Sequence, residues 1–121
     1  QDLAQTLAVK CAALGISSHL KGLQTLRIKE TNRIKAIKNE LLKLGVRSEI
    51  NKDDLLIKKS LPMIYTRQEI STYKDHRMAM AFAPLAMKFG EIKIEDSEVV
   101  KKSYPGFWKD MKSAGFNISI K

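Results

Sequence analysis

Cysteine, histidine and nucleotide-binding glycine motifs are scarce or missing in this chain, and each shortage excludes a class of site. One cysteine, Cys11, and two histidines stand among 121 residues. No internal disulfide can form, so we expect Cys11 to be a small buried hydrophobe. No cysteine or histidine cluster has metal-ligand spacing, so a structural zinc site is not expected. Neither a Gly-x-Gly-x-x-Gly nor a Walker sequence indicates a nucleotide fold.

Long apolar runs are missing as well. No stretch reaches the roughly 18 to 20 apolar residues of a membrane span, and no leader of basic, apolar and small residues opens the chain. We therefore expect a soluble, cytoplasmic protein without a membrane partner. Apolar residues make up 44% of the sequence, enough for the core of one ordinary domain. No low-complexity linker divides residues 1–121, so no internal domain boundary is predicted.

Basic residues outnumber acidic ones by 22 to 13, giving a net charge of +9. This excess favours anionic partners, but charge alone does not choose among nucleic acid, lipid and phosphorylated metabolites. Most lysines are scattered over several segments with few aromatic residues between them. That distribution is typical of a solvated surface.

The spacing of apolar residues predicts a mixed α/β (α+β) order of elements. Residues 2–14 and 32–44 have helical periodicity, and glycine follows each of them. In the first helix Leu3, Leu7, Cys11 and Leu14 are expected on the buried side, together with Ala4, Ala8 and Ala12. Segments 46–50 and 55–58 flank a polar turn and predict a hairpin. Further strands are predicted at 22–28, 92–94 and 117–120, an apolar helix from Met78 that kinks or ends at Pro84, and a short helix with Pro105 in its first turn.

Charged residues gather at three predicted helix starts, where the helix dipole already favours anions. Lys29 and Arg33 are four residues apart and share a face if their helix begins as early as Lys29. His76 and Arg77 begin the apolar helix, where an arginine fork can bind a carboxylate through two hydrogen bonds. Lys102 precedes a Tyr-Pro step. Together these side chains suggest a site for a phosphate or a carboxylate.

Structural interpretations of the same residues remain open. Glu30 and Arg33 fit an ordinary solvated helix start with a pair at three-residue spacing. Asp75 fits a helix cap, and Asp2 with Gln5 resembles a capping box. Arg77 fits a surface role less well, because it stands beside the most apolar helix of the chain. The remaining assignments place His19 on the surface and Met78, Met80 and Met87 in the core.

Four motifs resemble those of the EPSP synthase family, the 3-phosphoshikimate 1-carboxyvinyltransferases. They are LRIKETNRI at 26–34, TYKDHRMAM at 72–80, DLAQTL at 2–7 and KSYP at 102–105. They occur in the family's order and span nearly the whole chain. The resemblance implies transfer of the enolpyruvyl group from phosphoenolpyruvate to the 5-hydroxyl of shikimate 3-phosphate, with release of phosphate and without a metal or organic cofactor.

Residue roles follow from the same resemblance. Asp2 is expected to accept the proton of the 5-hydroxyl, and Glu30 to protonate the methylene carbon of phosphoenolpyruvate. Lys29 is expected to contact the shikimate part. The residues expected to hold phosphoenolpyruvate are Arg33, Arg77 and Lys102, with His76 beside them. Glu30 stands between Lys29 and Arg33, whose charges favour its ionised form, so its protonation requires another effect such as burial.

The family fold has two domains built from βαβαββ units, with helices inside, sheets outside and the active site in the cleft between them. The chain resembles the last one to two units of the C-terminal domain, and it begins with Gln1 where a complete protein would have Met. We therefore expect a fragment that folds at least in part, lacks the N-terminal domain as its partner, and has no transferase activity alone.

Two departures and two alternatives accompany this resemblance. Thr25 stands where some relatives carry Asn, which puts its contact to the shikimate ring in doubt, and Asn32 replaces the commoner Asp, which suggests a structural role there. The related UDP-N-acetylglucosamine enolpyruvyl transferases share the fold, although the run DHRMAM at 75–80 argues against them. A basic module that binds nucleic acid is the alternative from another class.

Overall fold

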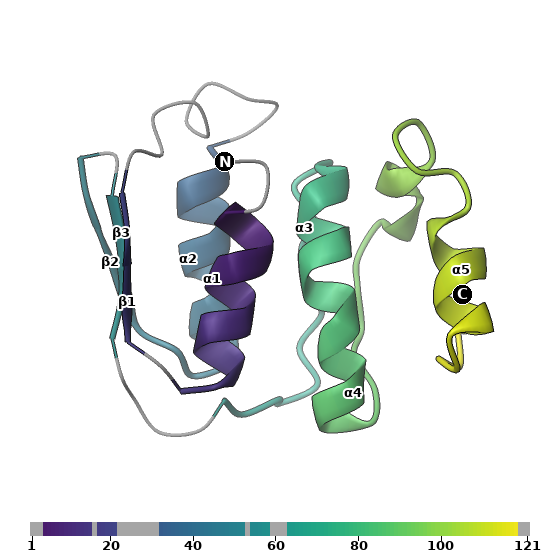
Figure 1. Ribbon diagram of the computed structural model, residues 1–121, viewed down its shortest axis with the longest axis horizontal. Helices are drawn as coiled ribbons and strands as arrows, with labels where there is room; N and C mark the ends of the chain where they lie inside the picture. Colours follow the sequence, from purple (N-terminus) through teal and green to yellow (C-terminus); the bar gives the residue numbers. More distant parts are fainter. Residues whose placement is uncertain (1–3, 16, 22–31, 53, 59–62, 119–121) are drawn as a thin grey trace.

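The computed structural model describes residues 4–15, 17–21, 32–52, 54–58 and 63–118. In these residues a small sheet forms one layer and helices cover one of its faces (Figure 1). The helices are α1 (Ala4–Ala13), α2 (Arg33–Lys43), α3 (His76–Phe82), α4 (Ala86–Phe89) and α5 (Phe107–Ser113), with 3-10 segments η2 (Ala83–Leu85) and η3 (Ser97–Val100). The mixture of helices and strands predicted from the sequence is therefore confirmed, as helices on a small sheet.

The sheet has three strands in the order β1-β3-β2. Strand β1 spans Ser18–Leu20, β2 spans Ser48–Asn51 and β3 spans Asp54–Ile57. Both outer strands pair antiparallel with β3. The β2–β3 hairpin confirms the predicted one. Strand β1 was not predicted, and the strand predicted at 22–28 lies outside the described residues.

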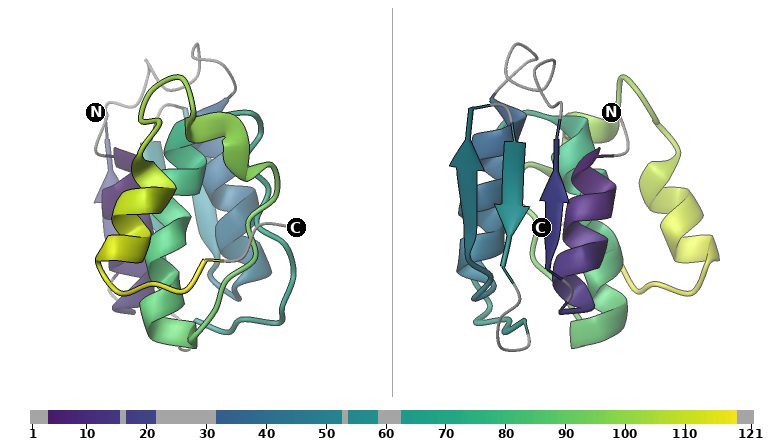
Figure 2. Two further views of the ribbon diagram at one scale, coloured as in Figure 1. Left: turned by 90° about the vertical axis from the view of Figure 1, so that its right-hand side faces the viewer. Right: turned by 60° about the vertical axis from the view of Figure 1, so that its left-hand side comes forward.

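The three longest helical runs lie side by side and point the same way, as Figure 1 and both views of Figure 2 show. Helix α1 packs against α2 and α3, and α2 also contacts α3. After α1 the chain runs back through β1. After α2 the antiparallel β2–β3 hairpin runs up and down the sheet, and residues 63–75 then carry the chain back to the end where α3 begins (Figure 1). The starts of α2 and α3, which carry two of the charged motifs, are thereby neighbours in space.

One apolar core joins the helices to the sheet. Side chains of Ile34, Ile37 and Leu41 from α2 are buried against Leu55 and Ile57 from β3, and α3 completes the core. Spacing of three, four and seven residues along α2 produces one apolar stripe, as expected for a helix on a sheet. This core fixes where Arg33 stands, because Arg33 directly precedes Ile34.

The buried face of α1 differs from the prediction. Ala8 and Ala12 are buried as expected, but Leu7 and Leu14 are 48% and 63% exposed. Gln5 is buried in their place, next to the stripe formed by the alanines. Residues at positions i, i+3 and i+7 share one side of a helix, and small alanines on that side let two neighbouring helices approach closely. Close packing therefore selected the alanine face over the leucine face.

Further expectations for α1 need correction. Cys11 is only partly buried. The side chain of Gln5 is fully buried, and neither of its amide atoms has a hydrogen-bond partner, so Gln5 does not form a capping box. His19 is exposed as expected, but it also pairs with Asp54 across the sheet at 3.0 Å.

The C-terminal third confirms one prediction and corrects others. Helix α3 ends at Phe82 and turns into a 3-10 segment at Pro84, as the proline predicted. Pro105 lies before Gly106, the N-cap of α5, and not in the first helical turn. Residues 92–94 form no strand, because only one bridge pairs Ile94 with Ile70. Residues 117 and 118 are not in a strand either.

The three methionines that were predicted to lie in the core differ in how deeply they are buried. Met78 is fully buried and Met80 packs partly buried against a second cluster, whereas Met87 is 80% exposed. Met87 lies in α4, which has no buried residue. The core prediction for Met87 is therefore wrong, since the helix beyond Pro84 turns it away from the core.

Candidate functional site

Helix α2 begins at Arg33 because Asn32 caps it. The Asn32 backbone is extended, and its side-chain oxygen accepts a hydrogen bond from the backbone N–H of Lys35 at 3.2 Å. This is the usual N-cap arrangement, and it confirms a structural role for Asn32. Helix α2 begins at Arg33, so the condition under which Lys29 and Arg33 would share a helical face is not met, and Lys29 itself lies outside the described residues.

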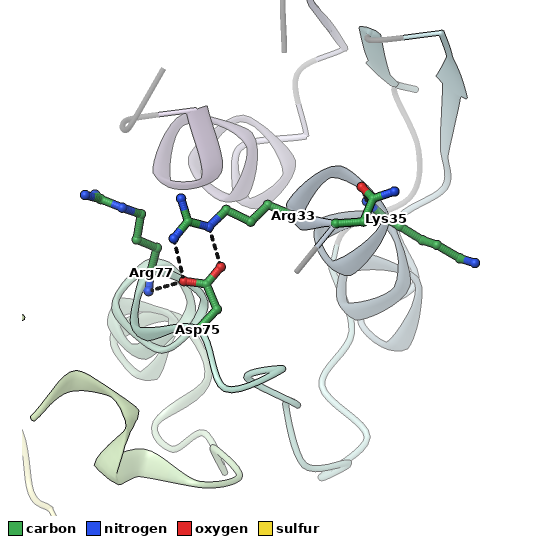
Figure 3. A network of polar contacts seen from close by, with 5 residues as sticks. Arg33, Lys35, Asp75 and Arg77 are labelled. Atoms are coloured by element: carbon green, nitrogen blue, oxygen red, sulfur yellow. Dashed lines mark hydrogen bonds and ion pairs between the residues drawn. The ribbon is translucent and has the colours of Figure 1, made fainter. Parts of the chain in front are cut away.

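The guanidinium of Arg33 is buried and binds the carboxylate of Asp75. Nε of Arg33 donates to Oδ2 at 2.5 Å, and its terminal nitrogen donates to Oδ1 at 3.0 Å. Only 2% of the Arg33 side chain and none of the Asp75 side chain is exposed. Two parallel bonds between a planar fork and a carboxylate fix both groups in orientation. Figure 3 shows the Arg33 side chain reaching from α2 to Asp75 at the start of α3.

The same carboxylate caps α3. Oδ1 of Asp75 also accepts a hydrogen bond from the backbone N–H of Arg77 at 3.0 Å. The predicted cap is confirmed, and it is only half of what Asp75 does. A single buried carboxylate therefore joins Arg33 of one motif to Arg77 of another, although 42 residues separate Arg33 from Asp75.

A tight turn places Asp75. Tyr73 and Lys74 both adopt left-handed backbone conformations, with φ of 57° and 56°, which non-glycine residues adopt only at a cost of about 1–3 kcal/mol each. The N–H of Asp75 donates to the carbonyl of Thr72 at 2.9 Å. Thr72 is itself completely buried. The turn is thus fixed on both sides of its strained pair.

Glu40 of α2 holds this turn in place. Its buried carboxylate accepts hydrogen bonds from the backbone N–H of Ser71 at 2.8 Å and from the hydroxyl of Tyr73 at 2.6 Å. Lys43 forms an ion pair with it at 2.7 Å. Burial, and then the hydrogen bond to Glu40, raise the pKa of Tyr73 to about 12. Sequence reasoning missed Glu40, because a charged residue in a helix normally indicates the solvent face.

The other predicted residues lie around this pair or outside the described residues. His76 and Arg77, both partly buried, begin α3. In Figure 3 the side chain of Arg77 points away from Asp75. Lys102 is exposed in the turn after η3, and η3 packs against α3, near the end where α3 begins (Figures 1 and 2). Asp2, Lys29 and Glu30, with Thr25, lie outside the described residues.

Two hollows on the described surface lie elsewhere. One of about 220 Å³ is an apolar groove between α1 and the α3–η2 region, and the other of about 300 Å³ lies beside β2 and β3. Neither is lined by Arg33 or Arg77. The second hollow is lined by Lys38, Arg47 and Lys58, but Arg47 and Lys58 are exposed. The buried Arg33–Asp75 pair holds its charged groups in a fixed orientation, which makes it the stronger candidate for an anion site.

The described part of the chain contains neither a group of metal ligands nor a helix suited to span a membrane. Its histidine, cysteine and carboxylate side chains form no group of three that could hold a metal ion. None of its helices combines the length and apolar character needed to cross a membrane.

Comparison with known proteins gives a consistent result. The family model of EPSP synthase (3-phosphoshikimate 1-carboxyvinyltransferase) matches residues 1–111. A 3-phosphoshikimate 1-carboxyvinyltransferase of Bacteroides fragilis is 45% identical, with 98% of this chain and 29% of the relative covered. One from Dehalococcoides mccartyi is 40% identical, covering 98% and 27%.

A solved structure supports the same relationship. The EPSP synthase of Acinetobacter baumannii is 27% identical and superposes with a TM-score of 0.81, covering 97% of this chain and 28% of that protein. The chain thus spans less than a third of the length of the relatives that it matches.

Proposed function

Since this chain belongs to the EPSP synthase family, we propose that the complete protein containing it transfers the enolpyruvyl group of phosphoenolpyruvate to the 5-hydroxyl of shikimate 3-phosphate and releases phosphate. The bidentate bond between Arg33 and Asp75, whose carboxylate also accepts from the backbone N–H of Arg77, supports this proposal most directly. Two motifs far apart in the sequence are brought together where helices α2 and α3 begin.

The charge of the substrates explains why cations must gather there. Phosphoenolpyruvate carries a phosphate and a carboxylate, and arginine binds both through its planar fork. We assign phosphoenolpyruvate binding to Arg33, Arg77 and Lys102, with His76 beside them. Fixed cations of this kind also stabilise charge that develops in the transition state.

Acid and base roles are assigned to residues outside the described part. Asp2 is the proposed base for the 5-hydroxyl, Glu30 is the proposed acid for the methylene carbon, and Lys29 is the proposed contact to shikimate. The charge of Arg33 is balanced by Asp75 at 2.5 Å.

The chain alone is proposed to be inactive. Its matched relatives are more than three times longer, and neither hollow described above is lined by Arg33 or Arg77. The N-terminal domain of the family is the proposed partner that completes the cleft. The proposed location is the cytoplasm, and no cofactor is proposed.

A phosphate-release assay tests the proposal. The complete protein is expected to release phosphate only when phosphoenolpyruvate and shikimate 3-phosphate are both present, and the 121-residue chain is expected to release none. UDP-N-acetylglucosamine serves as the control acceptor. Turnover with that acceptor alone, or by the isolated chain, would contradict the proposal.

A further inference from the structure

We propose that Asp75 is a positioning residue: it holds the guanidinium of Arg33 in the orientation in which that group binds the phosphoenolpyruvate anion. This inference rests on the proposed function and adds a residue to it. Asp75 was expected from the sequence only to cap its helix. The structure assigns it two further hydrogen bonds with Arg33.

The geometry explains how Asp75 orients Arg33. The carboxylate engages one edge of the guanidinium, formed by Nε and one terminal nitrogen. A guanidinium is planar and carries donors on more than one edge. Fixing one edge therefore fixes the plane and the direction of the others. An arginine without this contact has several rotatable bonds, and an anion that binds it must order them at an entropic cost.

Asp75 can orient Arg33 because it is itself rigid. Its side chain is completely buried, it caps α3, and its N–H is bound to Thr72. The strained pair before it, Tyr73 and Lys74, persists only because the surroundings determine it. Strain of this kind gathers at functional sites more often than in ordinary loops. A helix cap alone needs none of these supports.

Two other roles for Asp75 predict different results. If Asp75 merely neutralised Arg33, its removal would leave an additional positive charge, and an anion would bind more tightly. If the pair were only structural, removal would lower stability without changing the affinity of the folded protein. Positioning predicts weaker binding, because the guanidinium of Arg33 then loses part of the two-bond contact with Asp75 that fixes its plane. The sign of the change in affinity therefore separates the three roles.

The variant Asp75→Asn distinguishes these three roles. Oδ1 accepts the bonds from Arg77 and from the terminal nitrogen of Arg33, whereas Oδ2 accepts only from Nε. An asparagine with its oxygen in the Oδ1 position keeps the cap and one bond to Arg33. Its NH₂ group then faces the Nε–H donor, so the variant loses the second bond of the fork.

The experiment measures the dissociation constant of phosphoenolpyruvate by calorimetry, using the complete protein saturated with shikimate 3-phosphate. Asp75→Asn is expected to weaken binding about tenfold, a coupling within the range of contacting residues. Glu49→Gln removes an exposed carboxylate on β2 and controls for net charge, so it should leave the constant unchanged. Affinity for shikimate 3-phosphate should not change in either variant.

A double-mutant cycle shows whether Asp75 acts through Arg33. Arg33→Lys keeps the charge but lacks the planar fork, so adding Asp75→Asn to it should change phosphoenolpyruvate affinity less than about twofold. Unchanged or tighter binding by Asp75→Asn alone, or equal losses for both substrates, would overturn the inference while leaving the proposed function intact. Failure of the native protein to bind phosphoenolpyruvate would overturn both.

Discussion

Arg33 and Asp75, 42 residues apart, form a bidentate ion pair that is almost completely buried. Through it the start of α2 is tied to the start of α3, and the two motifs with the most charge become one cluster. Removing only one partner of such a buried pair lowers the free energy of unfolding, because the remaining buried charge loses its compensating charge.

Removing the guanidinium alone should therefore be costly for folding. Arg33→Met is expected to lower the free energy of unfolding by about 3–5 kcal/mol. The double variant Arg33→Met with Asp75→Asn should recover most of that loss, because asparagine keeps the cap without a buried charge. Urea unfolding of the purified chain, followed by circular dichroism, measures both values. A single variant as stable as the native chain would show that the pair is not buried.

Removing the N-cap of α2 should have a smaller effect on stability than removing Arg33. Asn32→Ala should destabilise the chain by about 1 kcal/mol, since the N–H of Lys35 loses its acceptor. Asn32→Asp serves as the matched control, because aspartate caps equally well and its charge suits a helix N-terminus. The same unfolding measurement applies. Equal losses in both variants would exclude capping as the role of Asn32.

Two methionines allow one substitution to be compared in two environments. Met78 is fully buried and Met87 is 80% exposed. Met78→Ala is expected to cost about 2–5 kcal/mol through lost contacts and a cavity, and Met87→Ala less than about 0.5 kcal/mol. Thermal unfolding of the two variants should reproduce this order. The reverse order would contradict the arrangement of α3 and α4.

The raised pKa of Tyr73 predicts how stability depends on pH. Tyr73 keeps its proton in the folded chain up to about pH 12, while the unfolded chain loses it near 10.0. The contribution of Tyr73 to stability is therefore complete below pH 10 and declines as pH rises from 10 to 12. Tyr73→Phe lacks this decline, so native and variant unfolding free energies should converge over that interval. A gap that widens with pH would contradict the environment assigned to Tyr73.

The sequence predicted those elements whose apolar period is strong. Helix α2 and the β2–β3 hairpin lie where periodicity and turn residues placed them. Helix α1 was located correctly and Ala8 and Ala12 are buried as predicted, but Leu7 and Leu14 are exposed, because the small alanines permit closer helix packing than the leucines. Strand β1 has three residues and exists through its pairing with β3, a tertiary contact that no local pattern contains.

For the site, charge at predicted helix starts selected Arg33 and Arg77 as candidates but did not predict their contacts. The structure places the side chain of Arg33 and the backbone N–H of Arg77 on the carboxylate of Asp75. The pairing with Asp75 could not be predicted, because Arg33 stands at a position that periodicity leaves undetermined between surface and interior. Glu40 was missed for another reason, because a charged residue in a helix normally indicates the solvent face. Its one signal is that it follows Ile37 by three residues, on the buried side of α2.

The central claim is that Arg77 belongs to a phosphoenolpyruvate site next to the Arg33–Asp75 pair, and calorimetric titration of the complete protein tests it most directly. With shikimate 3-phosphate bound, Arg77→Ala should lose at least about tenfold in affinity for phosphoenolpyruvate, as expected for a charge-assisted bond. Arg67→Ala, which removes an exposed arginine paired with Glu91, should retain native affinity. Equal affinities in the native protein and the Arg77→Ala variant would contradict the claim.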